Sequence, residues 1–247
     1  MATLTVGTSA RGTIKATGTS GRSTTYDSVR ENSTFVTSTT NNPTSDDTSA
    51  ILYNKVDAGR GSSQWSFNRT YAYFNLSSIP SGATINSVTL GITSSGASND
   101  TGVYILSSSA FSNGTSTLAS SEYYSSIDYT TTYGQVGSSQ WPSTAGDTKD
   151  ITLSSDAIND VSGSTRLIMA FVEAQDYNDT DTAFLLNPSR AGFKFSEGSD
   201  VMVLKIDYTA ASSGDIDQVS GVSFSSISHI DNVAKANIAE IDGISAS

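Results

Sequence analysis

The sequence predicts an all-β fold, a jelly-roll-like antiparallel β-sandwich, and three observations lead to that class. Apolar residues alternate with small or polar ones over short runs, which is the period of a half-buried strand. The chain contains 11 Tyr and 9 Phe among many Thr, Val and Ile residues, and all of these favour strands. Gly, Asn, Asp and Ser separate the runs and are typical turn residues. Short strands at close spacing with polar turns indicate a sandwich or jelly roll.

The predicted elements follow one another along most of the chain. Residues 1–50 are rich in Thr, Ser and Gly with isolated apolar residues, and are expected to form an N-terminal arm with early strands. Clear alternation begins at residue 51 and continues over residues 62–76, and after a Pro-Ser-Gly turn a further strand follows over 84–92. Strands are also predicted over residues 102–109, 149–154, 165–174, 182–188, 191–196 and 201–209, with a helical turn over 156–163. The sandwich domain is therefore expected to span residues 51–209, and a linker residues 210–215.

The last segment, residues 216–247, is a three-copy repeat with a period of eleven residues. The copies read IDQVSGVSFSS, ISHIDNVAKAN and IAEIDGISAS. Each has an aliphatic residue at its first, fourth and seventh places and Gly or Asn at its sixth. The nine aliphatic positions are Ile216, Val219, Val222, Ile227, Ile230, Val233, Ile238, Ile241 and Ile244.

Two geometries fit this period. An eleven-residue repeat makes three turns of a helix and favours a right-handed supercoil, whereas Ser-Gly, Asp-Asn and Asp-Gly pairs favour sharp corners between short strands. The Gly or Asn in every copy favours the corners. In both geometries a unit this small cannot bury its own aliphatic edge. The repeat is therefore expected to be an assembly device that joins copies of the chain, plausibly as a trimer, or docks on a partner; a flexible tail is the alternative.

Composition disfavours several functions. The net charge is −11 and the 13 Lys and Arg residues form no cluster, so no nucleic-acid partner is expected. The chain contains no Cys, which excludes disulfides and thiolate metal sites. No apolar leader and no membrane-spanning run is present, so we expect synthesis without a signal peptide and no membrane partner.

No catalytic site is expected. The single His, His229, occupies a spacer position of the repeat that Gln218 and Glu240 fill in the other copies. With one His and no Cys, neither a Cys/His pair nor a His-based zinc site can form. Carboxylates for glycoside hydrolysis would have to come from Glu173, Asp176, Asp179, Asp181 and Glu197, and sequence cannot place two of them at the required separation.

Two groups of residues are candidate binding sites. The loop DYNDTD carries closely spaced oxygen ligands of the kind that Ca²⁺ takes, in Asp176, Asn178, Asp179 and Asp181; a solvated turn is the alternative, and no other cofactor is expected. Trp65, Trp141, Tyr123 and Tyr124 would stack on sugar rings if they were exposed, and packing in the core is the alternative.

The stretch RTYAYFNLSSIPSGATINSVTLGI, residues 69–92, resembles the β-sandwich modules called DNRLRE or family-96 carbohydrate-binding-type modules. A looser similarity continues over residues 50–209, and Asn75 stands where the family usually has Asp. The repeat is similar to "I-x-K-I-N-G-V" segments at the ends of tailed-phage structural proteins.

This resemblance implies a non-enzymatic virion structural protein, made in the host cytoplasm and located in the particle with other virion proteins as partners. Capsid decoration, a fibre or spike component and a tail accessory are equally compatible roles. The alternative that it implies is a carbohydrate-binding module or adhesin that recognises surface glycans.

Overall fold

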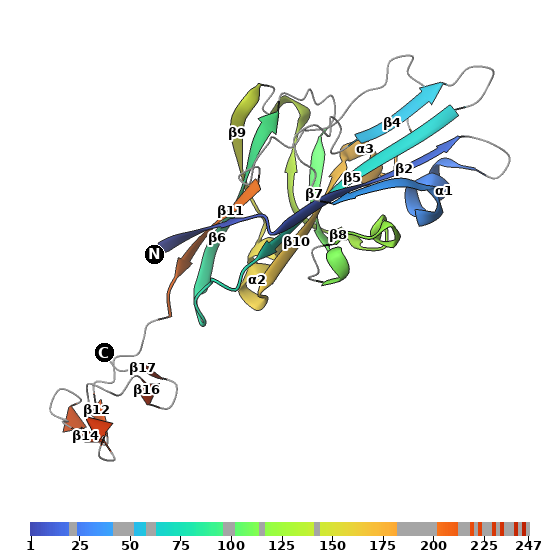
Figure 1. Cartoon of the computed structure of the whole chain (residues 1–247). Helices are drawn as coiled ribbons and strands as arrows, with labels where there is room; N and C mark the ends of the chain where they lie inside the picture. The colour runs from blue at the N-terminus through green and yellow to red at the C-terminus, as the bar shows by residue number, and fades with distance from the viewer. Residues whose placement is uncertain are drawn as a thin grey trace.

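A computed structural model describes residues 1–19, 24–41, 52–57, 63–95, 102–113, 117–140, 144–181, 202–211 and six two-residue strands between 218 and 245. Two antiparallel sheets pack face to face, which confirms the all-β sandwich (Figure 1). The four-stranded sheet has the order β1 (Ala2–Gly7), β11 (Met202–Thr209), β6 (Thr84–Ser95), β9 (Ala145–Thr152). The seven-stranded sheet has the order β3 (Val36–Asn41), β2 (Ala10–Thr19), β5 (Ser63–Asn75), β10 (Arg166–Glu173), β7 (Val103–Ser108), β8 (Ile127–Val136), with β4 (Leu52–Asp57) also paired to β5.

The early strands are integral parts of both sheets. β1 pairs with β11, with Val6 opposite Leu204, and β2 pairs with β5, with Ala16 opposite Phe67. The chain passes from one sheet to the other between Gly7 and Ala10. The sandwich thus begins at β1 rather than at residue 51, and the first 50 residues are not a separate arm.

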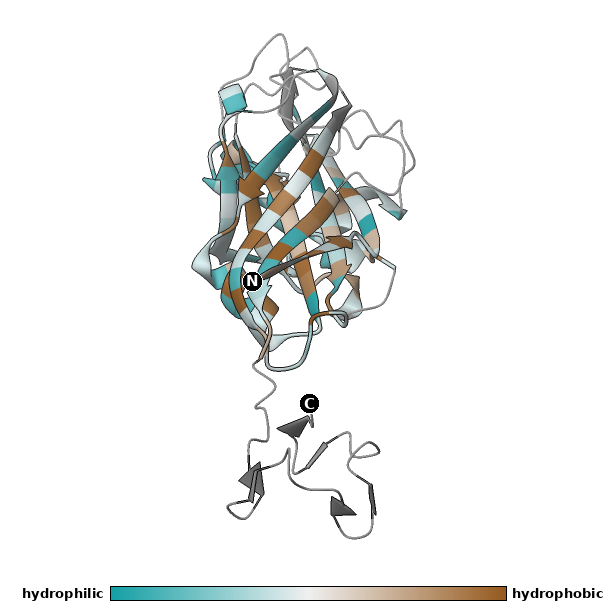
Figure 2. Cartoon of the chain, turned by 90° about the vertical axis from the view of Figure 1, so that its left-hand side faces the viewer, coloured by the Kyte–Doolittle hydropathy of each residue, from teal (hydrophilic) through white to brown (hydrophobic). Residues whose placement is uncertain are grey.

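The main core lies between the two sheets. Alternate residues of β6 and β11, such as Leu90 and Leu204, meet Phe74 of β5 and Phe171 of β10 there, all essentially unexposed. Helix α2 (Ser155–Gly163) closes one end of this core with Ala157 and Val161, as the predicted helical turn implies. Bands of apolar and polar residues alternate along the strands in Figure 2, as a half-buried strand requires.

A second core covers the outer face of the seven-stranded sheet. Trp65, Phe67 and Tyr71 of β5 pack there under α1 (Tyr26–Glu31) and the one-turn helices at residues 33–35, 111–113 and 120–122. Thr25 caps α1, since its Oγ1 accepts a hydrogen bond from the Ser28 amide at 3.2 Å. A Cβ atom on Gly18 would lie 2.2 Å from Val29, so only glycine allows α1 to lie this close to β2. Both faces of this sheet are therefore buried.

Several predicted elements differ from those observed. β8 was not predicted, because its Thr-rich sequence lies at a sheet edge and only three of its ten residues are buried. The strands predicted over 182–188 and 191–196 lie outside the described residues. No described helix has the length and apolar character needed to cross a membrane.

The C-terminal repeat forms three successive hairpins beyond the end of β11 (Figure 1). The strands are β12 (Gln218–Val219), β13 (Val222–Ser223), β14 (His229–Ile230), β15 (Val233–Ala234), β16 (Glu240–Ile241) and β17 (Ile244–Ser245). Val219 lies opposite Val222, Ile230 opposite Val233, and Ile241 opposite Ile244. The repeat thus consists of short strands joined at corners and not of a continuous helix. The remaining predicted assembly positions, Ile216, Ile227 and Ile238, lie outside the described residues.

Candidate functional site

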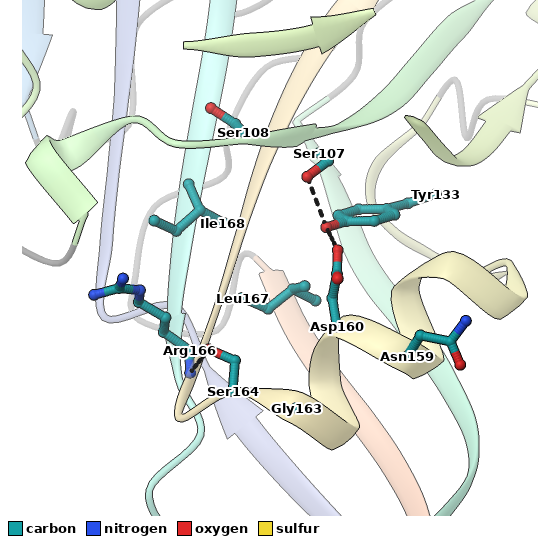
Figure 3. Close-up of a pocket in the computed structure, with 10 residues that line it drawn as sticks. All are labelled: Ser107, Ser108, Tyr133, Asn159, Asp160, Gly163, Ser164, Arg166, Leu167 and Ile168. Carbon is teal, nitrogen blue, oxygen red and sulfur yellow. Dashed lines mark hydrogen bonds between the residues drawn. The ribbon is translucent and has the colours of Figure 1, made fainter. Parts of the chain in front are cut away.

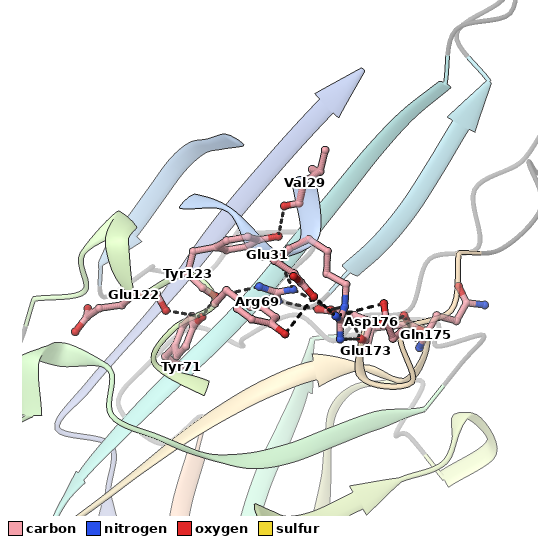
Figure 4. A network of polar contacts seen from close by, with 12 residues as sticks. Val29, Glu31, Arg69, Tyr71, Glu122, Tyr123, Glu173, Gln175 and Asp176 are labelled. Carbon is pink, nitrogen blue, oxygen red and sulfur yellow. Dashed lines mark hydrogen bonds and ion pairs between the residues drawn. The ribbon is translucent and has the colours of Figure 1, made fainter. Parts of the chain in front are cut away.

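A buried ion pair lies at the centre of the second core (Figure 4). Arg69 of β5 is on the same face of the strand as Phe67 and Tyr71 and is 0% exposed. Its guanidinium donates two hydrogen bonds to the Asp176 carboxylate, from Nε to Oδ2 at 2.7 Å and from Nη2 to Oδ1 at 2.8 Å. It also donates to the carbonyl oxygens of Tyr123 at 3.1 Å and Arg30 at 2.9 Å. Such two-pronged pairing fixes both side chains.

A second arginine reaches the same carboxylate from α1. Arg30 Nε donates to Asp176 Oδ1 at 3.1 Å and Arg30 Nη2 to the Asp176 carbonyl oxygen at 2.7 Å. Its Nη1 lies 3.1 Å from the carboxylate of Glu31 and 3.3 Å from that of Asp179, two side chains that are about half exposed. Two buried cations therefore share the buried carboxylate of Asp176. The half-exposed carboxylates of Glu31 and Asp179 supply further negative charge to Arg30.

The backbone and the tyrosines around this pair hold it in place. The Glu173 carboxylate accepts hydrogen bonds from the amides of Gln175 and Asp176 and so caps α3 (Ala174–Tyr177). The Arg69 guanidinium lies 4.1 Å from the centre of the Tyr123 ring, a cation–π contact. Tyr71 Oη donates to the Tyr123 carbonyl at 2.6 Å. The network joins α1, β5, α3 and the turn at Tyr123, so we interpret it as a structural pin of the outer layer.

Burial and charge act in opposite directions on the titration of these groups. Burial is the largest influence on Arg69 and lowers its pKa, but the charge and hydrogen bond of Asp176 together with Tyr123 and Tyr129 outweigh it and hold that pKa above its ordinary value. Burial raises the pKa values of Tyr71, Tyr123 and Tyr129 above the ordinary value of 10.0, although Arg69 opposes the shift in each case. Burial and a hydrogen bond to Asp160 raise the pKa of Tyr133 in the main core.

These raised tyrosine pKa values predict alkaline unfolding. The buried phenols stay protonated in the folded chain but ionise near pH 10 in the unfolded chain, so their contribution to stability is complete below about pH 10 and decreases above it. In a titration followed at 295 nm, we expect these four tyrosines to ionise only together with the loss of near-ultraviolet circular dichroism. In urea all 11 Tyr should titrate near pH 10. If all of them also titrated near pH 10 while the protein was still folded, these tyrosine pKa values would not be raised by the fold.

The residues predicted to bind calcium are engaged with other groups. Both oxygens of Asp176 accept hydrogen bonds from guanidinium groups, so a cation would have to displace two arginines. Asp179 pairs with Arg30, Asp181 accepts a hydrogen bond from Trp65 Nε1 at 3.1 Å, and Asn178 ends α3. Within the part of the chain that the structure describes, no three acidic or His side chains cluster as metal ligands. The geometry of this loop is that of ion pairs between protein groups.

Of the four predicted sugar-stacking residues, two lie in the core. Trp65 is 6% exposed and Tyr123 is 0% exposed, so neither can offer a ring face to a sugar. Trp141 lies outside the described residues. Tyr124 is half-buried and lies at the surface beside Arg30, whose Cζ is 5.6 Å from the ring centre.

Tyr124 lines an open groove of about 540 Å³ between α1 and the turn at residues 121–125. The groove presents the carboxylates of Asp27 and Glu31, the amide of Asn32 and several serines. Tyr124 Oη donates to Glu31 Oε1 at 3.4 Å. The chemistry is that of an acidic, hydroxyl-rich surface with one aromatic ring.

A row of tyrosine rings leads up to this groove. Their successive centroid separations are 3.8 Å from Tyr104 to Tyr177, 6.4 Å from Tyr177 to Tyr129 and 5.1 Å from Tyr129 to Tyr124. All four side chains are half-buried, and the hydroxyl of Tyr129 lies on the buried side. The row comes from β7, β8, α3 and the turn before β8, so its assembly depends on the tertiary fold.

A smaller hollow of about 240 Å³ lies between α2 and the strands β7, β8 and β10 (Figure 3). Its polar centre is the Tyr133 hydroxyl, which donates to Asp160 and lies 2.9 Å from Ser107 Oγ. Arg166 and Ser164 also line it. Its main polar groups, Tyr133, Asp160 and Ser107, already bind one another. We therefore interpret this hollow as a contact between α2 and the strands and not as a binding site.

The sequence did not identify the Arg69–Asp176 pair, although a signal was present. Arg69 occupies a place in an alternating strand where the neighbouring places hold Trp65, Phe67 and Tyr71. An arginine at a core position requires a buried carboxylate. Its partner could not be identified, because Asp176 lies 107 residues further along the chain. Compared with known proteins, the chain matches no family model and no curated protein sequence.

Proposed function

We propose that the protein is a non-enzymatic structural component of a particle, most simply a virion of a tailed phage, and that its C-terminal repeat fastens it there. One observation carries this proposal: the three hairpins of the repeat have strands of two residues each. Two-stranded ribbons of this length are not stable alone in water. They require a surface to pack on.

The sequence of the repeat supports the same conclusion. It carries nine aliphatic positions in phase, and six of them are opposed in pairs across the hairpins. Burying one such side chain contributes roughly 1.5 kcal/mol or more. The resemblance to terminal repeats of phage proteins supports the choice of a virion, as capsid decoration, fibre or spike component, or tail accessory. The partners are then copies of this chain, plausibly three, and other virion proteins.

The body of the protein supports a passive role. The carboxylates considered for catalysis that lie in the described part of the chain are used in other contacts: Glu173 caps α3, Asp176 and Asp179 bind arginines, and Asp181 binds Trp65. Glu197 lies outside that part. Hydrophobic cores on both sides of the seven-stranded sheet hold the body together.

Serine substitutions in the repeat test the proposal. Replacing Val219, Ile230 and Ile241 together by Ser removes one aliphatic residue from each hairpin, and we expect the assembled protein to become monomeric in sedimentation velocity. The matched control replaces the neighbouring spacer residues Gln218, His229 and Glu240 by Ser and should leave the mass unchanged. If the variant with Ser at positions 219, 230 and 241 kept the parent's mass and still joined a particle, the proposal would be overturned.

Glycan binding is the second candidate function, and the groove at Tyr124 favours it. The acidic lining from Asp27 and Glu31 favours neutral saccharides over acidic ones, because their hydroxyls can donate to the carboxylates. Tyr124→Ala is expected to weaken binding of a neutral oligosaccharide about tenfold, the effect of one lost ring contact of ~1.4 kcal/mol. Tyr208→Ala, at a half-buried tyrosine of the other sheet, is the control. An array of neutral and acidic glycans on which the parent and Tyr124→Ala give the same signals would exclude the groove.

A further inference from the structure

An uncharged groove lies at the end of the sandwich from which the repeat leaves. It has a volume of about 390 Å³ and runs between the turn after β5 and the C-terminal end of α2. Leu76, Ile79 and Pro80 line one side, and Val161 and the segment 162–165 the other. The turn is fixed by Asn75, whose side chain accepts a hydrogen bond from the Ser77 amide at 2.9 Å.

The lack of charge distinguishes this groove from the two hollows described above. None of its lining residues is charged, whereas the groove at Tyr124 carries Asp27 and Glu31 and the hollow beside α2 carries Asp160 and Arg166. The chain as a whole has a net charge of −11. Leu76, Ile85 and Val161 lie buried beneath the groove. Its accessible surface comes from Pro80, the partly exposed Ile79 and Ala83, and serines, and this uncharged surface suits an uncharged peptide segment.

The groove is close to the start of the repeat. A Cβ atom on Gly82 in its lining would lie 3.1 Å from the Cβ of Ala211, two residues past the end of β11. The segment 212–217 then leads to β12 and can span at most about 20 Å. The first copy of the repeat is thus tethered near the groove of its own chain. In an assembly it also lies within reach of the grooves of neighbouring chains.

The first copy of the repeat also differs from the others in chemistry. After Asp217 the rest of this copy, residues 218–226 (QVSGVSFSS), carries no charge, and Phe224 is the only Phe, Tyr or Trp of the repeat. The equivalent places hold Lys235 in the second copy and Ala246 in the third. A large apolar residue at this one place, within an uncharged stretch, matches the lining of the groove.

We propose that the groove between the turn after β5 and α2 receives the Phe224 segment of a second copy of this chain. The inference rests on the proposed assembly through the repeat and names the surface that the repeat contacts. The occupant is assigned to a neighbour because only an exchange of segments between chains would make this contact part of the proposed assembly. Each chain then donates one segment and accepts another, which is how head-to-tail rings close.

Engineered cysteines test the proposal, because the natural chain contains none. Ala83→Cys in the groove and Phe224→Cys in the repeat are prepared as two full-length single variants, mixed and oxidised. We expect a disulfide between the two chains at a yield about tenfold above the controls, because docking raises the local thiol concentration. The controls pair Ala83→Cys with Lys235→Cys, the equivalent place in the second copy, and Phe224→Cys with Thr130→Cys, an exposed place on β8.

The outcomes separate this inference from the assembly on which it rests. Strong cross-linking of Ala83→Cys with Phe224→Cys alone supports it. A disulfide that forms only within one chain carrying both cysteines would overturn it in favour of the chain's own repeat. No enrichment while the protein remains assembled would refute the groove and leave the proposed function standing. A monomeric parent would refute both.

Discussion

Asp176→Ala is expected to destabilise the protein by about 3–5 kcal/mol, the cost of leaving a buried charge without its partner. The substitution removes the carboxylate between Arg69 and Arg30, whose side chains are 0% and 4% exposed. Neither guanidinium can move into water without opening the second core. Urea unfolding followed by tryptophan fluorescence measures the loss, since Trp65 lies in the same core.

An exposed pair in the same protein provides the control. Lys205 Nζ lies 2.7 Å from Asp150, and both side chains are about half exposed. Asp150→Ala should therefore cost less than about 1 kcal/mol. If Asp176→Ala cost no more than Asp150→Ala, the buried network would not pin the outer layer. Converting the pair to Arg69→Met with Asp176→Leu should recover part of the loss, because Arg69 no longer leaves a buried charge unpaired, while Arg30 keeps its contacts to Glu31 and Asp179.

The sandwich could be predicted because its strands repeat with period two, but the burial of both faces of one sheet could not. In β5 the odd places hold Trp65, Phe67 and Tyr71, which predicted a buried face. The even places Ala72 and Phe74 belong to the main core. The layer that covers the odd face comes from α1 and from residues 111–113 and 117–126, whose polar sequences carry no periodic signal.

The acidic loop shows a different limit of sequence reasoning. Closely spaced acidic residues at 176–181 indicated a need for positive charge, and calcium was one way to supply it. In the fold the positive charge comes from Arg30 and Arg69, which lie 146 and 107 residues away in sequence. The spacing of residues in a loop can predict that a positive charge binds there. It cannot predict which group carries that charge when the group comes from a distant part of the chain.

The repeat was the most predictable part of the chain. Turn chemistry at Ser-Gly, Asp-Asn and Asp-Gly predicted corners, and the structure places antiparallel strand pairs on either side of each. The proposed partner follows from the small size of the unit, which cannot bury its own aliphatic edge. In the proposed assembly, the surface that the repeat contacts belongs to another molecule.

Ending the chain at Ala211 is expected to abolish assembly completely while leaving the body folded. Every strand pair of the two large sheets, and both hydrophobic cores, lie within residues 1–211. The thermal midpoint of the body should therefore change little once the contribution of assembly is removed. The loss of the repeat removes all nine aliphatic positions, more than any single substitution.

The most direct test of the proposed assembly is the mass in solution of the full chain and of this shortened variant, measured by sedimentation equilibrium over a wide concentration range. The full chain has a mass of 25.8 kDa, and a small integer multiple of it, plausibly three, is expected for the full chain at high concentration. The shortened variant should have the mass of one chain throughout. Two monomeric proteins, neither of which joins a particle, would contradict assembly through the repeat.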